Sequence, residues 1–273
     1  MSDACWLVVS DLDGTLLDHD RYGFEQAEPA LRRLRRERIP VILNTSKTRA
    51  ELSSLRARLH NAEPYVVENG SAVFMPPSVR GRRPADVEPR GGEDCRVFGR
   101  PRGDILAALQ PLRRRFRFEG FDDWDVPALM ARTGLDATAA GAALAREFSE
   151  PLLWRDSAAA LAAFRRELAA LGLNTLQGGR FLHVQGACDK GQSLNWLRAW
   201  YGAERGRPVR VIALGDSDND VAMLAAADIA VVIRSRHHPP PPVPTAARVI
   251  VSRAEGPRGW NETIGALLDE GLL

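Results

Sequence analysis

Residues 6–15 read WLVVSDLDGT, an apolar run that ends in an acidic turn. A short apolar run bounded by a turn is typical of a buried strand. Asp11 and Asp13 lie two residues apart at its end, where their carboxylates can converge on a hard cation such as Mg²⁺. Gly14 allows the backbone to turn sharply there. An acidic turn with a purely structural role can contain the same residues. Motifs elsewhere in the sequence are therefore needed to distinguish a structural turn from a metal-binding one.

Beyond this strand, short apolar runs alternate with helical patterns. Strands that alternate with helices favour parallel pairing and an α/β sheet. We therefore predict an α/β fold with a Rossmann-like, doubly wound parallel sheet. The further strands are predicted at 41–43, 65–67, 209–214 and 229–233, and the helices at 29–37, 49–59, 194–201 and 221–226.

The alternation stops at residues 76–103, which are rich in proline, glycine and arginine and indicate a linker. The chain then changes character, and we interpret it as an inserted α+β cap domain. Helices are predicted in it at 105–115 and 158–171, and strands at 151–154 and 181–184. The predicted division is a core of residues 1–84 and 188–273 with a cap of residues 85–187.

The composition is that of an ordinary globular protein, with 273 residues of which 45% are hydrophobic and 26% charged. No apolar run approaches the roughly 20 residues that span a bilayer, so we expect no membrane association. The first residues lack the pattern of a signal peptide, and the three cysteines show no metal-binding spacing. Reduced cysteines and a cytoplasmic location are therefore expected.

The net charge of +2 is too small to indicate nucleic acid binding by itself. Residues 113–118 (RRRFRF) interleave basic and aromatic side chains, as some nucleic-acid-binding segments do. We favour an amphipathic element of the cap for this stretch, and we expect no nucleic acid partner.

Three further polar clusters follow apolar runs or begin helices, as expected at the carboxyl edge of a parallel sheet, where ligands bind. Residues 215–220 (GDSDND) supply carboxylates that would complete an oxygen-rich Mg²⁺ site. Residues 44–48 (NTSKT) combine hydroxyl groups with a helix start, which suits a phosphate but also describes an ordinary helix cap. Residues 189–191 (DKG) place a lysine where it would neutralise a phosphate beside the acidic site.

Lysine is rare in this chain. Of the 37 lysine and arginine residues, only Lys47 and Lys190 are lysines. Positions that keep lysine in an arginine-rich chain are candidates for sites that need a compact ammonium group rather than a planar guanidinium. Both lie in the polar clusters described above, which supports a phosphate site there.

The order DLDGT, NTSKT, DKG and GDSDND resembles the four signature motifs of the haloacid dehalogenase superfamily of phosphatases. An insertion between the second and third motifs is similar to the type-2 cap of that superfamily. The resemblance covers nearly the whole chain. It implies a Mg²⁺-dependent phosphatase that works through a phosphorylated aspartate.

The resemblance also implies roles for particular residues. Asp11 would be the nucleophile, and Asp13 the general acid and base, which also offers its carbonyl to the metal. Thr45 would hold the phosphate, and Lys190 would neutralise charge. Asp216 would bind the metal, with Asp220 supporting either the metal or the lysine. The implied metal set is Asp11, Asp13, Asp216 and Asp220.

Further segments resemble the mannosyl-3-phosphoglycerate phosphatases within this superfamily. They are NTSKT, ENG at 68–70, REFSEPLLW at 146–154, GGRFLHVQG at 178–186 and GPRGWNE at 256–262. The resemblance implies a small substrate that carries a sugar, a carboxylate and a phosphate. Each residue that it places at the substrate has a structural alternative, such as a turn or a local backbone contact. These residues are Ser46, Lys47, Glu68, Asn69, Glu150, Arg180 and His183.

Other functions stay open at this point. Within the same fold, they include a glucosyl-3-phosphoglycerate phosphatase, another sugar phosphatase or a phosphomutase. A non-catalytic protein that binds a phosphorylated ligand is an alternative of another class, although the intact set of Asp11, Asp13, Lys190 and Asp216 argues against it. The expected partner is a small phosphorylated sugar or glycerate. We expect the protein to be a monomer or a homodimer.

Overall fold

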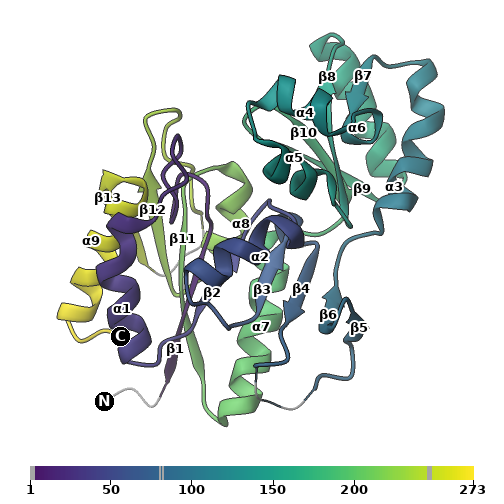
Figure 1. The fold of residues 1–273 in the computed structure, drawn as a ribbon. Coiled ribbons are helices and arrows are strands. Elements are labelled where there is room, and N and C mark those ends of the chain that lie inside the picture. Colours follow the sequence, from purple (N-terminus) through teal and green to yellow (C-terminus); the bar gives the residue numbers. More distant parts are fainter. Residues whose placement is uncertain (1–3, 80, 82, 245–247) are drawn as a thin grey trace.

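The computed structural model describes residues 4–79, 81, 83–244 and 248–273. It contains a nine-stranded sheet and a separate four-stranded sheet. Figure 1 shows the smaller sheet and its helices as a unit beside one end of the larger sheet. Across the described ranges, no helix is long and apolar enough to span a membrane.

The larger sheet has the strand order β13-β12-β11-β1-β2-β3-β4-β6-β5. Its first six strands in this order pair in parallel, and the last three pair antiparallel. The parallel strands are β1 Cys5–Ser10, β2 Val41–Asn44, β3 Tyr65–Val67, β11 Val209–Gly215, β12 Ile229–Arg234 and β13 Arg248–Glu255. The antiparallel strands are β4 Ala72–Met75, β5 Glu88–Arg90 and β6 Glu93–Val97.

The strand order reverses between β1 and β11, because the chain moves outward from β1 on one side and from β11 on the other. Such a switch point is where open α/β sheets bind ligands, beyond the carboxyl ends of the strands. Ser10 pairs with Leu214, so the residues that follow the two strands start at the same level. The topology therefore brings the turn after β1 and the loop after β11 together.

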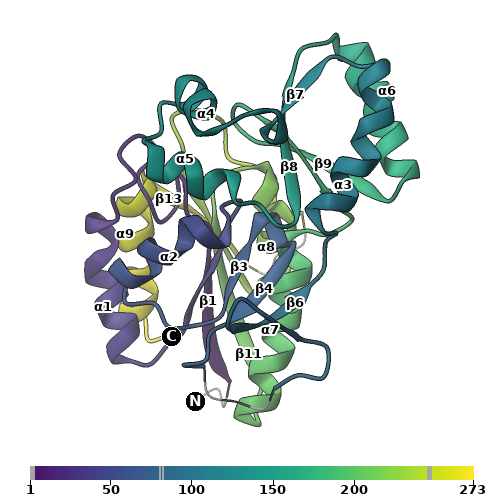
Figure 2. The same ribbon diagram turned by 45° about the vertical axis from the view of Figure 1, so that its right-hand side comes forward.

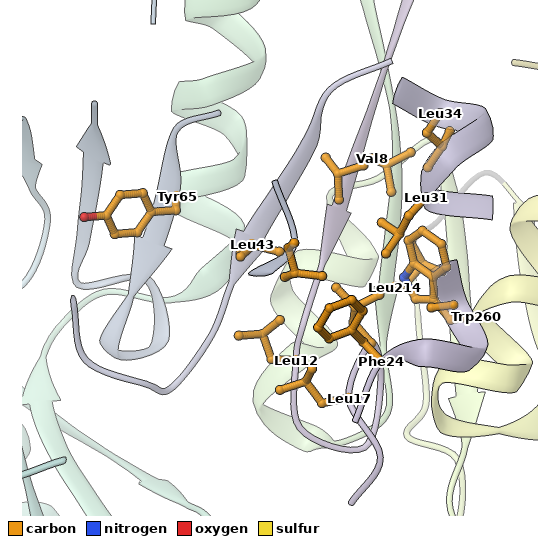
Figure 3. Packing of buried hydrophobic residues seen from close by; sticks show 14 of the residues in the cluster. Val8, Leu12, Leu17, Phe24, Leu31, Leu34, Leu43, Tyr65, Leu214 and Trp260 are labelled. Carbon is orange, nitrogen blue, oxygen red and sulfur yellow. The ribbon is translucent and has the colours of Figure 1, made fainter. Parts of the chain in front are cut away.

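Helices cover both faces of this sheet. Side chains alternate along a strand, so Val8 of β1 faces one layer, while Leu7 and Val9 face the other. Figure 3 shows Leu31, Leu34 and Trp260 packed beside Val8. The first layer contains α1 Glu28–Arg36, α2 Arg49–Arg58 and α9 Gly256–Asp269, and the second contains α7 Lys190–Arg205 and α8 Val221–Ala225. The predicted doubly wound α/β core is confirmed.

The smaller sheet is antiparallel, with the order β7-β8-β10-β9. One face carries Leu152 and Val184 against α3 and α6, and the other carries Leu153 and Phe181 against α4 and α5. Figure 2 shows α5 over α2 of the core. The elements are α3 Arg102–Leu109, β7 Phe118–Gly120, α4 Val126–Thr133, α5 Ala137–Leu144, β8 Ser149–Trp154, α6 Ala158–Ala170, β9 Leu173–Gln177 and β10 Leu182–Gly186.

Short 3₁₀ helices complete the elements. They are η1 Glu25–Ala27, η2 Glu68–Gly70, η3 Gln110–Arg114, η4 Phe121–Asp123 and η5 Asp218–Asp220. The helix predicted at 105–115 ends as an α-helix at Leu109 and continues as η3, because Pro111 has no N–H to donate. Residues 235–244 form a loop, as their proline content predicted.

The predicted boundaries between core and cap stay a prediction. Within them, β5 and β6 hydrogen-bond to the core sheet through β4, although both strands lie in the range assigned to the cap. The RRRFRF stretch lies in the cap, where Phe116 and Phe118 are buried in its hydrophobic core. The favoured interpretation as an amphipathic cap element agrees with this burial.

Candidate active site

Asp11 directly follows β1 and lies at the switch point. Its N–H donates to the carbonyl of Leu214 at 2.9 Å, which ties the start of the turn to β11. The side chain is buried, with 5% of its surface exposed. Gly14 adopts φ 76°, and a Cβ there would lie 2.7 Å from Oδ2 of Asp216. Glycine is thus required where the turn after β1 passes the loop after β11.

Lys190 is the first residue of α7 and reaches into the same point. Its Nζ donates to Oδ1 of Asp11 at 2.6 Å and to Oδ1 of Asp220 at 2.7 Å, and its side chain is completely buried. Burial lowers the pKa of Lys190, but the two carboxylates more than offset this, and the pKa is raised above its usual value. Lys190 therefore stays a cation between two carboxylates.

Asp216 and Asp220 come from the loop after β11. Oδ2 of Asp220 accepts from the N–H of Asp216 at 3.0 Å and of Ser217 at 3.2 Å, while its Oδ1 binds Lys190. Asp220 therefore organises the loop and positions the lysine. Asp216 accepts from Thr15 Oγ1 at 3.3 Å.

Asp11, Asp216 and Asp220 each bring one carboxylate oxygen within 4.8 Å of the other two. Burial raises the pKa of Asp11 well above its usual value, opposed chiefly by Lys190. Burial and the carboxylate of Asp220 raise the pKa of Asp216 to about 6, against a lowering by His238. Three buried carboxylates against one lysine leave excess negative charge, and an all-oxygen donor set suits Mg²⁺. The residues present therefore fit the metal that the sequence predicted.

Asp13 lies outside this group of three carboxylates. Its Oδ2 is 2.9 Å from Nζ of Lys47, and its Oδ1 is buried without a hydrogen-bond partner among the described residues. A buried carboxylate oxygen without a donor is unfavourable unless a ligand completes it. The predicted contribution of Asp13 to the metal through its main-chain carbonyl stays a prediction.

The NTSKT segment joins β2 to α2. Thr45 is buried, and its Oγ1 accepts from the N–H of Lys47 at 3.2 Å. Thr48 caps the helix in a reciprocal pair with Glu51. Asn44 donates to the carbonyl of Lys190 at 3.0 Å, which connects this segment to the start of α7. The two lysines thus belong to one connected set of loops, with Lys47 on Asp13 and Lys190 on Asp11.

Glu68 joins the core to the cap. Its carboxylate accepts from the N–H groups of Glu147 and Phe148 at 2.8 and 3.1 Å, and from Oγ of Ser149 at 2.6 Å. Both oxygens are used and the side chain is buried. Glu68 therefore holds the cap segment 147–149 to the core, and its predicted contact with the substrate stays a prediction.

The residues after Glu68 hold the active-site loops. Asn69 has φ 58°, and its Oδ1 accepts from Nδ2 of Asn219 at 3.1 Å. Gly70 has φ 91°, and a Cβ there would lie 2.2 Å from the carbonyl oxygen of Asp189. The turn therefore approaches both the loop after β11 and the start of α7 closely. The side chain of Asn69 thus contacts the loop after β11, and its predicted contact with the substrate stays a prediction.

The three predicted substrate residues of the cap do not converge. Glu150 shares the face of Leu152, and its carboxylate accepts from Arg102 at 2.7 Å and from the N–H of Asp122 at 2.8 Å. Burial raises the pKa of Glu150, an effect that Arg102 opposes. Both carboxylate oxygens of Glu150 thus have partners within the cap, and its predicted contact with the substrate stays a prediction.

Arg180 lies in the segment that leads into β10, and His183 lies within β10. Arg180 is exposed and donates to the carbonyl of Arg132. His183 lies on the opposite face of β10 from Val184, and its Nδ1 is buried without a partner in the described ranges. Burial lowers the pKa of His183 to about 3, with a further contribution from Arg146, so the imidazole is neutral. Their roles at the substrate stay predictions.

Two residues that contact the candidate site, Arg146 and His238, were not predicted from the sequence. Arg146 donates from Nη2 to the carbonyl of Ser46 at 2.7 Å and from Nε to Ser149 at 2.9 Å, so a cap side chain contacts the NTSKT segment. His238 places Nε2 3.1 Å from Oδ2 of Asp216. Arg146 begins the REFSEPLLW segment, which was a usable signal. His238 lies in the proline-rich loop, where the sequence offers no pattern that points to the site.

The sequence profile of the haloacid dehalogenase-like hydrolases matches residues 8–80 and 166–251. These two segments flank a stretch that contains α3, α4, α5 and two of the four strands of the smaller sheet, β7 and β8. The chain therefore belongs to the haloacid dehalogenase-like hydrolase family, as its motifs predicted.

Relatives support a narrower class. A glucosyl-3-phosphoglycerate/mannosyl-3-phosphoglycerate phosphatase of Methanococcoides burtonii is 36% identical over 266 residues, which are 96% of this chain and 97% of the relative. Family membership and this similarity along nearly the whole chain identify the protein as a phosphoric monoester hydrolase.

Solved structures share the fold at low identity. The 0175 protein of Thermoplasma acidophilum has a TM-score of 0.67 and 18% identity, covering 97% of this chain and 99% of its own. Sucrose-phosphatase from Synechocystis sp. PCC6803, solved with sucrose and phosphate, has a TM-score of 0.61 and 14% identity, covering 97% of this chain and 98% of its own. The core and the inserted cap are therefore a known arrangement.

Proposed function

We propose that this phosphatase hydrolyses mannosyl-3-phosphoglycerate to mannosylglycerate and phosphate in a Mg²⁺-dependent reaction, with the glucosyl compound as the alternative substrate. The observation that carries the proposal is the buried contact of Asp11 with Lys190 beside two further carboxylates. The substrate is inferred from the similarity to the phosphatase of M. burtonii.

In the first step, Asp11 attacks phosphorus. A bond forms between a carboxylate oxygen of Asp11 and phosphorus, and the bond from phosphorus to the glycerate oxygen breaks. Asp13 gives its proton to the departing oxygen. Lys190 stays at Oδ1 of Asp11 and stabilises the charge on the phosphoryl oxygens. Asp11, Asp216 and Asp220 would hold Mg²⁺, which would supply further positive charge beside these oxygens.

In the second step, Asp13 acts as a base. It takes a proton from a water molecule, whose oxygen attacks phosphorus and breaks the bond to Asp11. Nζ of Lys47 lies 2.9 Å from Oδ2 of Asp13, and 17% of the Lys47 side chain is exposed. It is thus placed to move from Asp13 to an arriving phosphate oxygen. Thr45 and Ser46 lie in the same turn and would hold this phosphate.

The cap supports a substrate with a polar group away from the phosphate. Arg146 and His183 bring a cation and a neutral imidazole to the side of the cap sheet that does not carry α3 and α6. Arg180 is an exposed cation in the same cap. A carboxylate and sugar hydroxyls are the groups that such side chains bind. The expected cytoplasmic location and the monomeric or homodimeric state stay predictions.

The direct test is phosphate release with Mg²⁺ from mannosyl-3-phosphoglycerate, glucosyl-3-phosphoglycerate, mannose 6-phosphate and p-nitrophenyl phosphate. We expect the highest kcat/KM for a glycosyl phosphoglycerate. Asp11→Asn should reduce release to near background, whereas the exposed Asp104→Asn, which makes the same change far from the site, should leave it unaltered. Equal rates on all four compounds would remove the substrate assignment, and turnover by Asp11→Asn would remove the mechanism.

A further inference from the structure

Two histidines and an aspartate meet at the surface, apart from the residues assigned to the reaction. His19 and Asp20 lie in the segment after the DLDGT turn, and His237 lies in the loop after β12. Each offers a ligand atom, and these atoms lie within 4.8 Å of one another. The rings of His19 and His237 stack with centroids 4.1 Å apart, and Nδ1 of His19 is 3.5 Å from Oδ1 of Asp20. Segments more than 200 residues apart in sequence thus supply one cluster.

The donor set differs in kind from that of the active site. Imidazole nitrogens favour Zn²⁺, Co²⁺ and Ni²⁺, whereas carboxylate oxygens favour Mg²⁺. Zn²⁺ binds imidazole nitrogen at about 2.0–2.1 Å in a tetrahedral arrangement, which places neighbouring ligand atoms about 3.3 Å apart. The three side chains are exposed and have to close by about 1.5 Å at most, a rotamer adjustment rather than a backbone movement.

The backbone on both sides of the cluster is already held. Oδ1 of Asp18 accepts from the N–H of Asp20 at 3.0 Å and of Arg21 at 2.8 Å. On the other side, Arg236 pairs with Glu255 at 3.0 Å, immediately before His237. The cluster lines a pocket of about 380 Å³ together with Gly14 of the acidic turn. The pocket leaves room for water molecules at the open coordination positions.

We propose that His19, Asp20 and His237 form a second metal site, which takes a divalent transition metal of the Zn²⁺ or Co²⁺ type and not Mg²⁺. The site joins the segment after the acidic turn to the loop of residues 235–244. The next residue of that loop, His238, contacts Asp216. A metal bound by His237 therefore restrains the loop that reaches the active site.

The test is a titration of the full-length protein with Co²⁺ in excess Mg²⁺, which keeps the carboxylate site filled. Visible Co²⁺ absorption and isothermal titration calorimetry report binding without any use of enzyme activity. We expect one Co²⁺ per chain, displaced by Zn²⁺. His237→Ala and His19→Ala should each weaken binding by at least about 10-fold, as for the loss of an essential contact of a metal site.

His60→Ala is the matched control, because His60 is also exposed but lies just after α2, outside the cluster. It should bind Co²⁺ as the unaltered protein does. Circular dichroism of each variant establishes that the fold is retained. Co²⁺ affinities that are equal in His19→Ala, His237→Ala and the unaltered protein would overturn the site, as would the absence of binding in excess Mg²⁺. Neither result depends on the substrate or on hydrolysis.

Discussion

At the scale of single residues, the central feature of the site is a buried cation, Lys190, between two carboxylates. Lys190 contacts Asp11 and Asp220 at 2.6 and 2.7 Å, so its ammonium group determines where both carboxylates lie. Asp220 in turn accepts from the backbone of the loop that carries Asp216. Asp11 and the loop after β11 are therefore positioned by the same side chain.

The first prediction concerns the shape of this cation. Lys190→Arg keeps the charge, but a planar guanidinium does not fit a completely buried position between two oxygens at these distances. We expect kcat to fall by about 10² or more, the loss typical of one strong transition-state contact. Lys47→Arg, at a partly exposed position, should have a smaller effect. A harmless Lys190→Arg combined with a severe Lys47→Arg would reverse the two roles.

The second prediction concerns the stability of the metal-free protein. The pKa values of Asp11 and Asp216 are raised, that of Asp216 to about 6. Groups with raised pKa values in the folded state destabilise it as pH rises and they ionise. In EDTA, the melting temperature should therefore fall as the pH rises from about 4, near the ordinary pKa of an aspartate, through the raised pKa of Asp216 at about 6, and less so in Asp11→Asn. The same variant should be more stable than the unaltered protein at pH 8. If Asp11→Asn melted at a lower temperature than the unaltered protein in EDTA at pH 8, the inferred excess of negative charge among Asp11, Asp216 and Asp220 would be contradicted.

At the scale of elements, the turn of η2 connects three parts of the molecule. Glu68 and Asn69 both adopt left-handed conformations, with φ 49° and 58°. Such conformations are unfavourable outside glycine and persist where surrounding contacts enforce them. Here the contacts are the cap segment 147–149 on Glu68, the loop after β11 on Asn69 and the start of α7 on Gly70.

The third prediction tests this connection. Glu68→Gln preserves the shape of the side chain but replaces one acceptor oxygen with an NH₂ group, which cannot accept a hydrogen bond. A buried N–H or hydroxyl is then left unpaired, which lowers the stability of the protein by about 1–3 kcal/mol. We expect faster hydrogen exchange at residues 147–149 and a reduced kcat/KM. Glu37→Gln, at an exposed position after α1, is the control and should change neither. Unaltered exchange at residues 147–149 in Glu68→Gln would show that this carboxylate does not hold the cap.

The sequence predicted most of the elements of the core, because its strands are continuous apolar runs that end in polar turns. It did not predict β4, β13 or α9, nor β5 and β6 in the core sheet. Both are short, and Glu88–Arg90 and Glu93–Val97 have more polar than apolar residues, so no alternation marks them. That Asp11, Lys190 and Asp216 lie close together was predictable, because their motifs follow strands or begin a helix. The hydrogen-bond partners of Glu68 and Glu150 were not predictable, because the partners of a buried carboxylate depend on tertiary contacts.

At the scale of the whole molecule, the core and the cap contribute different groups to the site. The carboxyl edge of the core sheet carries the carboxylates and both lysines, whereas the cap brings Arg146 to the main chain of Ser46. The cap is inserted between the second and third motifs, so its side chains can vary while the motifs stay in place. We therefore expect the cap to determine which substrate is bound and the core to carry out the reaction.

The fourth prediction concerns this division. Arg180 is a cap cation exposed to solvent, and a carboxylate far from the phosphate is the group it would bind. Arg180→Ala should reduce kcat/KM for the glycosyl phosphoglycerate by about 10-fold or more, in line with a lost charge-assisted hydrogen bond of about 1.5–3 kcal/mol. Hydrolysis of p-nitrophenyl phosphate should be unchanged. An equal loss on both substrates would show that Arg180 supports the fold instead.

The central claim is that Asp11 carries the phosphoryl group, and trapping the phosphorylated enzyme tests it most directly. Enzyme and mannosyl-3-phosphoglycerate are mixed with Mg²⁺, quenched in acid within one turnover and digested for peptide mass spectrometry. We predict one phosphoryl group on the peptide that contains Asp11, absent when EDTA is added before the substrate and absent in Asp11→Asn. A phosphoryl group on another residue, or a full turnover that never labels the Asp11 peptide, would contradict the account.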